Sequence, residues 1–158
     1  MTDPRALQDF YPDDFAHCYG CGRLNPTGLH IRTVAEGDEF VARFTPRAEH
    51  LAMPGFVYGG LIASLIDCHA MGAASAAALA AEDKRIGEAP SPRFVTARLD
   101  VSYLKPTPIG HELQIRASIK ERSDRKAVVA VTVTADGVVT AKGEVVAVRM
   151  PDSMRREG

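Results

Sequence analysis

The feature of this sequence that most constrains its fold is an apolar stretch at residues 55–81, GFVYGGLIASLIDCHAMGAASAAALAA. After a turn-like opening with Gly55, Gly59 and Gly60, it continues for about twenty residues without proline and is dominated by helix-favouring Leu, Ile and Ala. The second half is nearly all alanine and offers few polar positions to water, so we expect one long helix buried against a sheet. Asp67 lies within this run, where a charge is costly unless it is partnered or takes part in chemistry.

Alternating apolar and polar residues predict six strands. They are expected near residues 29–31, 40–44, 95–103, 113–119, 127–135 and 138–148. Residues 36–38 form the turn of a first hairpin, and Asp-Gly at residues 136–137 is a strong signal for a second. In the strand at 95–103, Val95 and Leu99 are predicted to share one face, with Thr96 on the opposite, polar face.

The predicted order of two strands, a long helix and four strands indicates an α+β protein. We expect a single domain over residues 1–158, with an N-terminal arm at 1–16 and a Cys- and Gly-rich loop at 17–28. One helix cannot cover both faces of six strands, so the sheet should curl around it on one side. The uncovered face and edges of the sheet then favour self-association, as a dimer or a dimer of dimers.

Length and charge exclude several classes of protein. The chain has 158 residues and a formal net charge of -1, which gives no reason to expect nucleic acid or an anionic membrane as a partner. The N-terminus has no secretory pattern, and no run of eighteen apolar residues lacks a charge or a break. We therefore expect a cytoplasmic protein whose phosphate recognition, if any, is local.

The three cysteines, Cys18, Cys21 and Cys68, fit a reducing compartment better than a disulfide framework. Cys18 and Cys21 form a Cys-x-x-Cys pair that, with His17 and His30, could supply four ligands to zinc. Because the chain has no second Cys-x-x-Cys or His-x-His pair, we favour a packed loop with free thiols and expect no metal site.

Three segments resemble one family. Tyr58 to Asp67, YGGLIASLID, is similar to the His-Gly-Gly motif with its later acid in hotdog-fold acyl-CoA thioesterases of the PaaI-type group, within the 4-hydroxybenzoyl-CoA thioesterase superfamily. The segments at 95–106 and 18–29 also resemble that family, and the likeness extends over residues 17–149. It implies a hotdog fold, in which a sheet wraps around one central helix.

The resemblance also implies roles for individual residues. Asp67 matches the catalytic acid, as general base or nucleophile; Gly60 matches the residue whose backbone N–H polarises the thioester carbonyl. Thr96 matches a hydroxyl that holds the acid or the water, although a plain cross-strand hydroxyl is the alternative. Tyr58 stands where the family usually has His, and Ala52 where some members have Asn.

The loss of that histidine leaves its role to another residue, with His50, Tyr58 and Ser64 as candidates. A structural ion pair is the alternative reading of Asp67. Cys68 and His69 follow the acid directly, but adjacent helical residues point about 100° apart and do not form a nucleophilic pair.

Spacing along the helix makes a further prediction. Backbone N–H groups at a helix start can bind an oxyanion, and Gly59 and Gly60 leave that approach open, with Leu61 next in line. Asp67 lies seven residues beyond Gly60, about 10 Å further along the same helix. One thioester cannot touch both, so donor and acid should come from two protomers.

Coenzyme A carries phosphates that need cations. The candidates are Lys105, Arg122, Arg125 and Lys126, with solvated turn residues as the alternative reading.

The predicted function is hydrolysis of an acyl-CoA thioester, which is the substrate, so no cofactor is expected. A non-catalytic acyl-CoA-binding or regulatory protein and a hotdog enoyl-CoA hydratase remain as alternatives.

Overall fold

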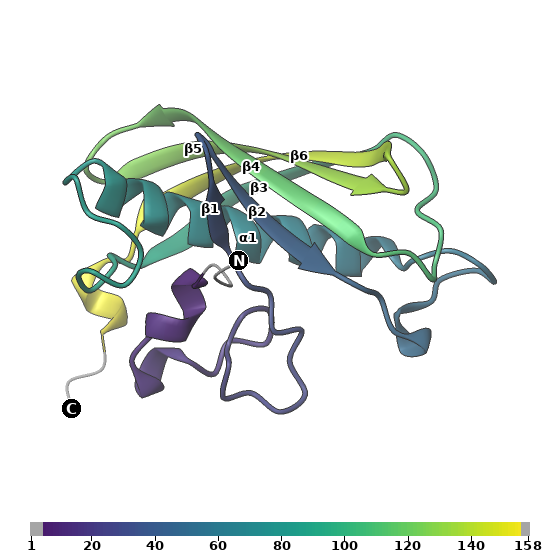
Figure 1. Ribbon diagram of the computed structural model, residues 1–158, viewed down its shortest axis with the longest axis horizontal. Coiled ribbons are helices and arrows are strands. Elements are labelled where there is room, and N and C mark those ends of the chain that lie inside the picture. Colours follow the sequence, from purple (N-terminus) through teal and green to yellow (C-terminus); the bar gives the residue numbers. More distant parts are fainter. Residues whose placement is uncertain (1–4, 156–158) are drawn as a thin grey trace.

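A computed structural model of the protein describes residues 5–155. One long helix, α1 (Gly59–Ala80), lies across one face of a six-stranded antiparallel sheet (Figure 1). The strands are β1 (Val34–Glu36), β2 (Glu39–Phe44), β3 (Phe94–Tyr103), β4 (Leu113–Arg122), β5 (Lys126–Ala135) and β6 (Val138–Arg149). Short 3₁₀ helices are η1 (Leu7–Phe10), η2 (Asp13–Phe15), η3 (Ala48–His50) and η4 (Asp152–Met154). The predicted α+β architecture and element order are confirmed.

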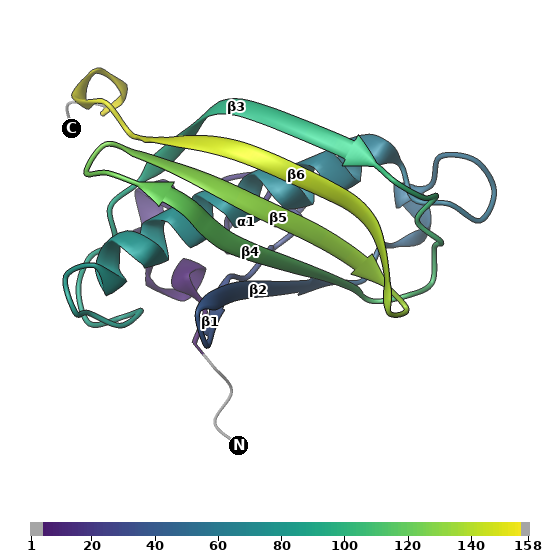
Figure 2. The same cartoon turned by 90° about the horizontal axis from the view of Figure 1, so that it is seen from above.

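The strand order in the sheet is β1-β2-β4-β5-β6-β3, so the first strand after the helix crosses to the far edge (Figure 2). The β5–β6 connection has the predicted Asp-Gly turn, with positive φ angles of 48° at Asp136 and 75° at Gly137. Two consecutive residues with positive φ are typical of the two-residue hairpin turn whose twist matches that of the paired strands. The long edge strand β3 therefore lies beside α1 at one side of the sheet.

The first strand begins later than expected. The prediction of a strand at residues 29–31 is wrong, because β1 starts at Val34. The N–H of Leu29 donates to the Tyr19 carbonyl and that of Ile31 to the Gly20 carbonyl, so the preceding loop takes the hydrogen bonds that a sheet would need. Their side chains are buried, which explains the strand-like apolar pattern.

The alanine-rich half of α1 packs against the sheet as predicted. Its fully or nearly fully buried alanines are Ala70, Ala73, Ala74, Ala76 and Ala78. Gly143 of β6 allows a close approach of α1, because a Cβ there would lie 2.6 Å from Cγ2 of Ile66. By length and composition α1 could cross a bilayer, but 72% of its most apolar window is buried within the fold, as in a core helix.

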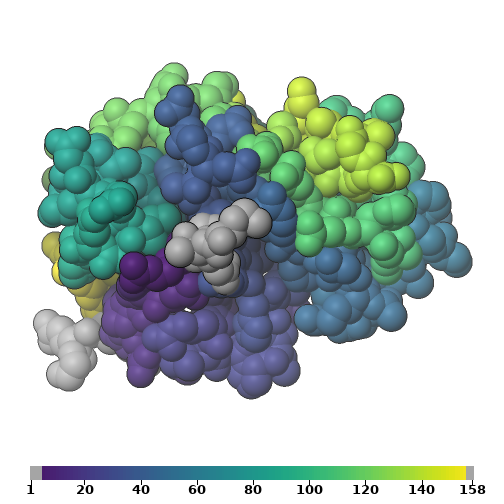
Figure 3. Space-filling model, in the orientation of Figure 1, coloured from purple at the N-terminus to yellow at the C-terminus, as the bar shows by residue number. Residues whose placement is uncertain are grey.

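Residues 5–28, the described part of the N-terminal arm and the loop after it, lie on the side of α1 that faces away from the sheet (Figures 1 and 3). A buried network holds them there. The Thr33 N–H donates to Gln8 Oε1 (2.8 Å), the Thr33 hydroxyl donates to Nδ1 of His69 (3.0 Å), and Nε2 of His69 donates to the Phe40 carbonyl (3.1 Å). Burial lowers the pKa of His69 to about 4, against the opposing effect of the Phe40 hydrogen bond, so the ring is neutral near pH 7.

Candidate functional site

The first turn of α1 presents two free backbone donors. The helix begins after Tyr58, whose carbonyl accepts hydrogen bonds from the N–H groups of Leu61 (3.1 Å) and Ile62 (3.4 Å). Within residues 5–155 the N–H groups of Gly59 and Gly60 have no backbone acceptor. Unpaired amides at a helix start carry the positive end of the helix dipole, so this turn can bind a developing negative charge.

Leu61 differs from this expectation. Its side chain is buried, and its N–H is already bonded to the Tyr58 carbonyl. The half-buried Gly59 and Gly60 are therefore the part of this turn whose N–H groups are free for a ligand, and CoA contact by Leu61 stays a prediction.

Two tyrosines surround these glycines. The Tyr103 hydroxyl, at the end of β3, donates to the Gly59 carbonyl (2.6 Å). The Tyr58 ring lies over Gly60, where an added Cβ would come within 2.4 Å of it. Burial, with a smaller contribution from Tyr58, raises the pKa of Tyr103. Tyr103 was missed at the sequence level, where it counted only as the last apolar position of a strand.

The other candidates to replace the family's histidine are engaged elsewhere. Nδ1 of His50 accepts the Arg47 N–H (2.9 Å) within η3, and its ring packs beside Phe44. The Ser64 hydroxyl donates to the Gly60 carbonyl (2.9 Å). Tyr58 alone among the three presents a side chain to solvent next to Gly60, with 58% of its surface exposed.

Asp67 lies two turns further along α1 and is half-buried. Its Oδ1 accepts a hydrogen bond of 2.5 Å from the Thr96 hydroxyl of β3. The structure thus brings together the acid and the hydroxyl that the family resemblance paired. No cation bridges to Asp67 among the described residues, so the ion-pair reading of this carboxylate has no partner there.

A β-bulge in β3 makes the contact between Thr96 and Asp67 possible. Thr96 pairs with Ala147 of β6, whereas Arg98 pairs with Val146, so Ala97 is an extra residue without a partner. Residues directly opposite each other share a face, and Ala147 and Val145 are buried against the helix. Thr96 therefore points toward α1, on the same face as Leu99, which corrects the predicted polar-face position.

The predicted phosphate-binding cations are divided between two ends of the sheet. Lys105 follows the end of β3, where its N–H donates to the Thr140 carbonyl. Arg122, Arg125 and Lys126 surround the β4–β5 turn, and Lys126 pairs with Val148, the residue that also pairs with Val95 at the start of β3. A ten-residue strand spans about 30 Å, so the four cations do not form one cluster within a protomer.

The three cysteines converge although only two are near each other in the sequence. Sγ atoms of Cys18, Cys21 and Cys68 all lie within 4.8 Å of one another, and the thiols are free. Hydrogen bonds from Cys21 and Cys68 lower the pKa of Cys18 to about 2; the same bonds and burial raise the pKa of Cys21 to about 12 and also that of Cys68. Sequence reasoning had grouped His17 and His30 with the pair instead of Cys68.

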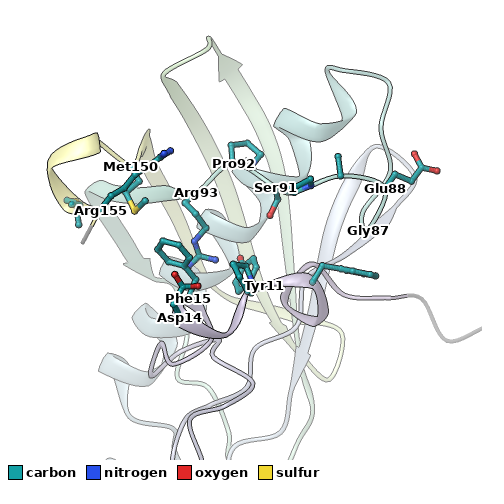
Figure 4. Close-up of a pocket in the computed structure, with 15 residues that line it drawn as sticks. Tyr11, Asp14, Phe15, Gly87, Glu88, Ser91, Pro92, Arg93, Met150 and Arg155 are labelled. Atoms are coloured by element: carbon teal, nitrogen blue, oxygen red, sulfur yellow. The ribbon is translucent and has the colours of Figure 1, made fainter. Parts of the chain in front are cut away.

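A separate cavity of about 980 Å³ lies between the arm, the segment after α1 and the C-terminal segment (Figure 4). Its wall includes the rings of Tyr11 and Phe15, over which the Arg93 guanidinium packs at 4.0 and 5.1 Å from the ring centroids. Neither Asp67 nor Gly60 lines it. Asp67 and the Gly59–Gly60 turn lie instead beside β3, which they contact through Thr96 and Tyr103.

The family model for the thioesterase superfamily matches residues 54–146, which include Gly59, Gly60, Asp67 and Thr96. The chain belongs to the thioesterase superfamily. A thioesterase superfamily protein from Shewanella loihica PV-4 is 43% identical to it, over 89% of this chain and 100% of that one, with a TM-score of 0.68. A search of curated proteins returns no match.

Two more distant solved structures share the hotdog fold of this superfamily member. The Escherichia coli PaaI protein from the phenylacetic acid degradation operon is 17% identical, over 78% of this chain and 81% of its own, with a TM-score of 0.63. The smu.793 protein of Streptococcus mutans UA159, solved bound to acetyl-CoA, is 21% identical, over 76% of this chain and 88% of its own, with a TM-score of 0.59. Superfamily membership supports thioester hydrolysis in general.

Proposed function

We propose that the protein hydrolyses an acyl-CoA thioester to the free acid and CoA, at a site formed by two protomers. The observation that carries this proposal is the position of Asp67, bonded to Thr96 at an open sheet edge, with free Gly59 and Gly60 amides on the same helix. Acetyl-CoA bound to the Streptococcus mutans relative supports a CoA ester as the substrate class.

The exposed edge strand explains how two protomers would complete the site. Thr96 contacts Asp67 near one end of β3, and Tyr103 contacts Gly59 at the other. Two copies of β3 paired antiparallel about Asp100, with Ala97 left unpaired as it is within each protomer, align Thr96 of one protomer with the partner's Tyr103. That register brings Asp67 of one helix to the partner's Gly59, which the separation of about 10 Å within one helix forbids.

In this arrangement the chemistry divides between two helices. The free amides at the start of α1 hold the thioester oxygen and stabilise the oxyanion that forms on attack. The Asp67 carboxylate of the other protomer either takes a proton from water, which then adds to the carbonyl carbon, or attacks that carbon itself. Collapse of the intermediate breaks the C–S bond and releases CoA thiolate, which takes up a proton. Where Asp67 is the nucleophile, water then hydrolyses the acyl–aspartate anhydride, which frees the acid and restores the carboxylate.

The same register reunites the divided cations. Lys105 follows the end of β3, and the partner's Phe94 at the start of its β3 would lie opposite. The β4–β5 turn, with Arg122, Arg125 and Lys126, is adjacent to the start of β3 within each protomer. A phosphate group of CoA would therefore meet Lys105 of one protomer and the turn of the other.

The test is release of free thiol from short-chain, medium-chain and aryl acyl-CoAs, followed with a thiol reagent. Asp67→Asn should lower turnover by about 1000-fold, whereas Asp38→Asn, an exposed acid in the β1–β2 turn, should leave it unchanged. Saturable acyl-CoA binding without thiol release in the unmodified protein would instead establish the non-catalytic alternative. For a hydratase no histidine is available beside the acid, because His69 is bonded within the core.

A further inference from the structure

The thiol cluster described above lies outside the proposed thioesterase site. Cys18 and Cys21 come from the loop beneath α1, and Cys68 comes from the helix (Figure 1). Cys68 follows Asp67 directly, and adjacent helical residues point about 100° apart. The acid therefore faces β3 while the thiol faces the loop, so the two groups serve different surfaces of one helix.

We propose that Cys18, Cys21 and Cys68 bind a thiophilic divalent cation of the zinc type, which joins the 17–28 loop to helix α1. The sequence suggested zinc only with His17 and His30; the fold replaces both histidines with a third sulfur. Three thiolates are a typical donor set for zinc, and each thiol releases its proton to solvent when it binds.

The distances fit such an ion. Zinc binds cysteine sulfur at about 2.3 Å, so two sulfurs of a tetrahedral site lie about 3.8 Å apart. Cys18 and Cys68 have their Sγ atoms 3.7 Å apart, and all three sulfurs are within 4.8 Å of one another. A disulfide would need about 2.05 Å, so the cluster is spaced for a shared ion rather than for a covalent bond.

A tight backbone turn joins the two loop cysteines. The Gly22 N–H donates to the Cys18 carbonyl (2.8 Å), which closes a turn over the Cys-x-x-Cys pair. A Cβ at Gly22 would lie 2.4 Å from the Cys18 nitrogen, and one at Gly20 would lie 2.2 Å from Sγ of Cys68. Both glycines are thus needed, the first for the turn and the second to admit the third sulfur.

Charge and solvent access are also suitable. A divalent cation with three thiolates leaves one negative charge, and the Arg93 guanidinium packs at 4.0 Å over the Tyr11 ring. Nη1 of Arg93 is buried without a hydrogen-bond partner in the described part of the chain. Cys18 is exposed, so water can fill the fourth position of the ion.

The experiment uses the full-length, reduced, chelator-treated protein, titrated with Zn²⁺ in competition with a chromophoric chelator and separately with Co²⁺. We expect one ion per chain, with thiolate-to-cobalt charge-transfer absorption and the visible bands of tetrahedral cobalt. Cys68→Ser should weaken zinc binding by more than about 100-fold, since loss of a direct ligand exceeds the effect of losing an outer contact. Equal affinity in Cys68→Ser, or cobalt spectra without thiolate bands, overturns the proposal.

Histidine variants provide the matched control. His17→Ala and His30→Ala should bind zinc as the unmodified protein does; loss of binding in either, with Cys68→Ser unaffected, overturns the assignment. A measurement on the unmodified chain avoids any folding defect: zinc should protect all three thiols from alkylation, read by mass spectrometry. Free alkylation of Cys68 at saturating zinc likewise refutes the site.

Discussion

The two edges of the sheet are built differently. At one edge, β1 has three residues, and Arg116 of β4 reaches across β2 to Glu36 (3.0 Å) and Glu39 (2.9 Å). At the other edge, β3 has ten residues, with Leu99 36% and Tyr103 53% exposed. Short, charged edges resist pairing with another chain, and long apolar ones invite it. The residues that touch the proposed site, Thr96 and Tyr103, are both on the long edge.

The largest difference between the two edges should appear when the same negative charge is placed on each edge strand in turn. Leu99→Glu places an acid beside the centre of the proposed β3 pairing, opposite the partner's Val101 and next to both copies of Asp100. We expect dimers to dissociate and turnover to fall by about 1000-fold, because oxyanion donor and acid are separated. Ala35→Glu, the same charge on β1, should change neither. Light scattering and thiol release test both, and a dimeric, active Leu99→Glu would remove β3 as the interface.

The contact of α1 with the β1 side of the sheet includes a buried, neutral histidine. His69 bonds to the carbonyl of Phe40, in the strand next to β1. Its pKa is about 4 in the folded chain against an ordinary 6.5, so the unfolded chain binds more protons between these values. The free energy of unfolding should be highest above pH 6.5 and fall by roughly 3 kcal/mol as the pH drops to 4.

Denaturant titrations across that pH range test the effect of His69. His69→Asn, which cannot titrate there, should flatten the dependence even where its overall stability is lower. A slope of equal size in both proteins would assign the acid sensitivity to other groups.

Removing the Thr96 hydroxyl should show whether its hydrogen bond to Asp67 contributes to turnover. Thr96→Val keeps the shape of the side chain but loses the hydrogen bond to Asp67, and we expect turnover to fall by about 10-fold. Thr96→Ser, which retains the hydroxyl, should remain close to the unmodified rate. A lowered kcat with unchanged KM in the valine variant identifies Thr96 as a positioning residue; equal rates for both variants would leave it a packing role only.

The smallest effect is expected at the β1 edge. Arg116→Ala removes both ion pairs to Glu36 and Glu39, which are largely solvated and therefore weak. Oligomeric state and turnover should not change, and any decrease in Tm should disappear at high salt. Association of the variant into larger species would show that these two ion pairs, and not the short length of β1, prevent this edge from pairing with another chain.

Local signals were sufficient for much of the fold and for part of the site. The alanine-rich helix and the Asp-Gly hairpin follow from residue type, and the pairing of Asp67 with Thr96 was expected from family resemblance. The bulge at Ala97 was not predictable, since an unpaired residue depends on the register with β6. Nor was the approach of Cys68 to Cys18, which are fifty residues apart and meet only because the loop folds under α1.

Because Ala97 has no partner, the faces to which the first side chains of β3 point depend more on the number of residues in the strand than on their identity. If Ala97 were instead taken into a regular ladder, pairing with Ala147 in place of Thr96, every preceding side chain of the strand would move to the opposite face of the sheet. Phe94, now buried, would turn outward, and the threonine would leave the acid. Divergence among relatives that keep this geometry should therefore proceed by exchange of side chains here, with gaps confined to the flanking loops.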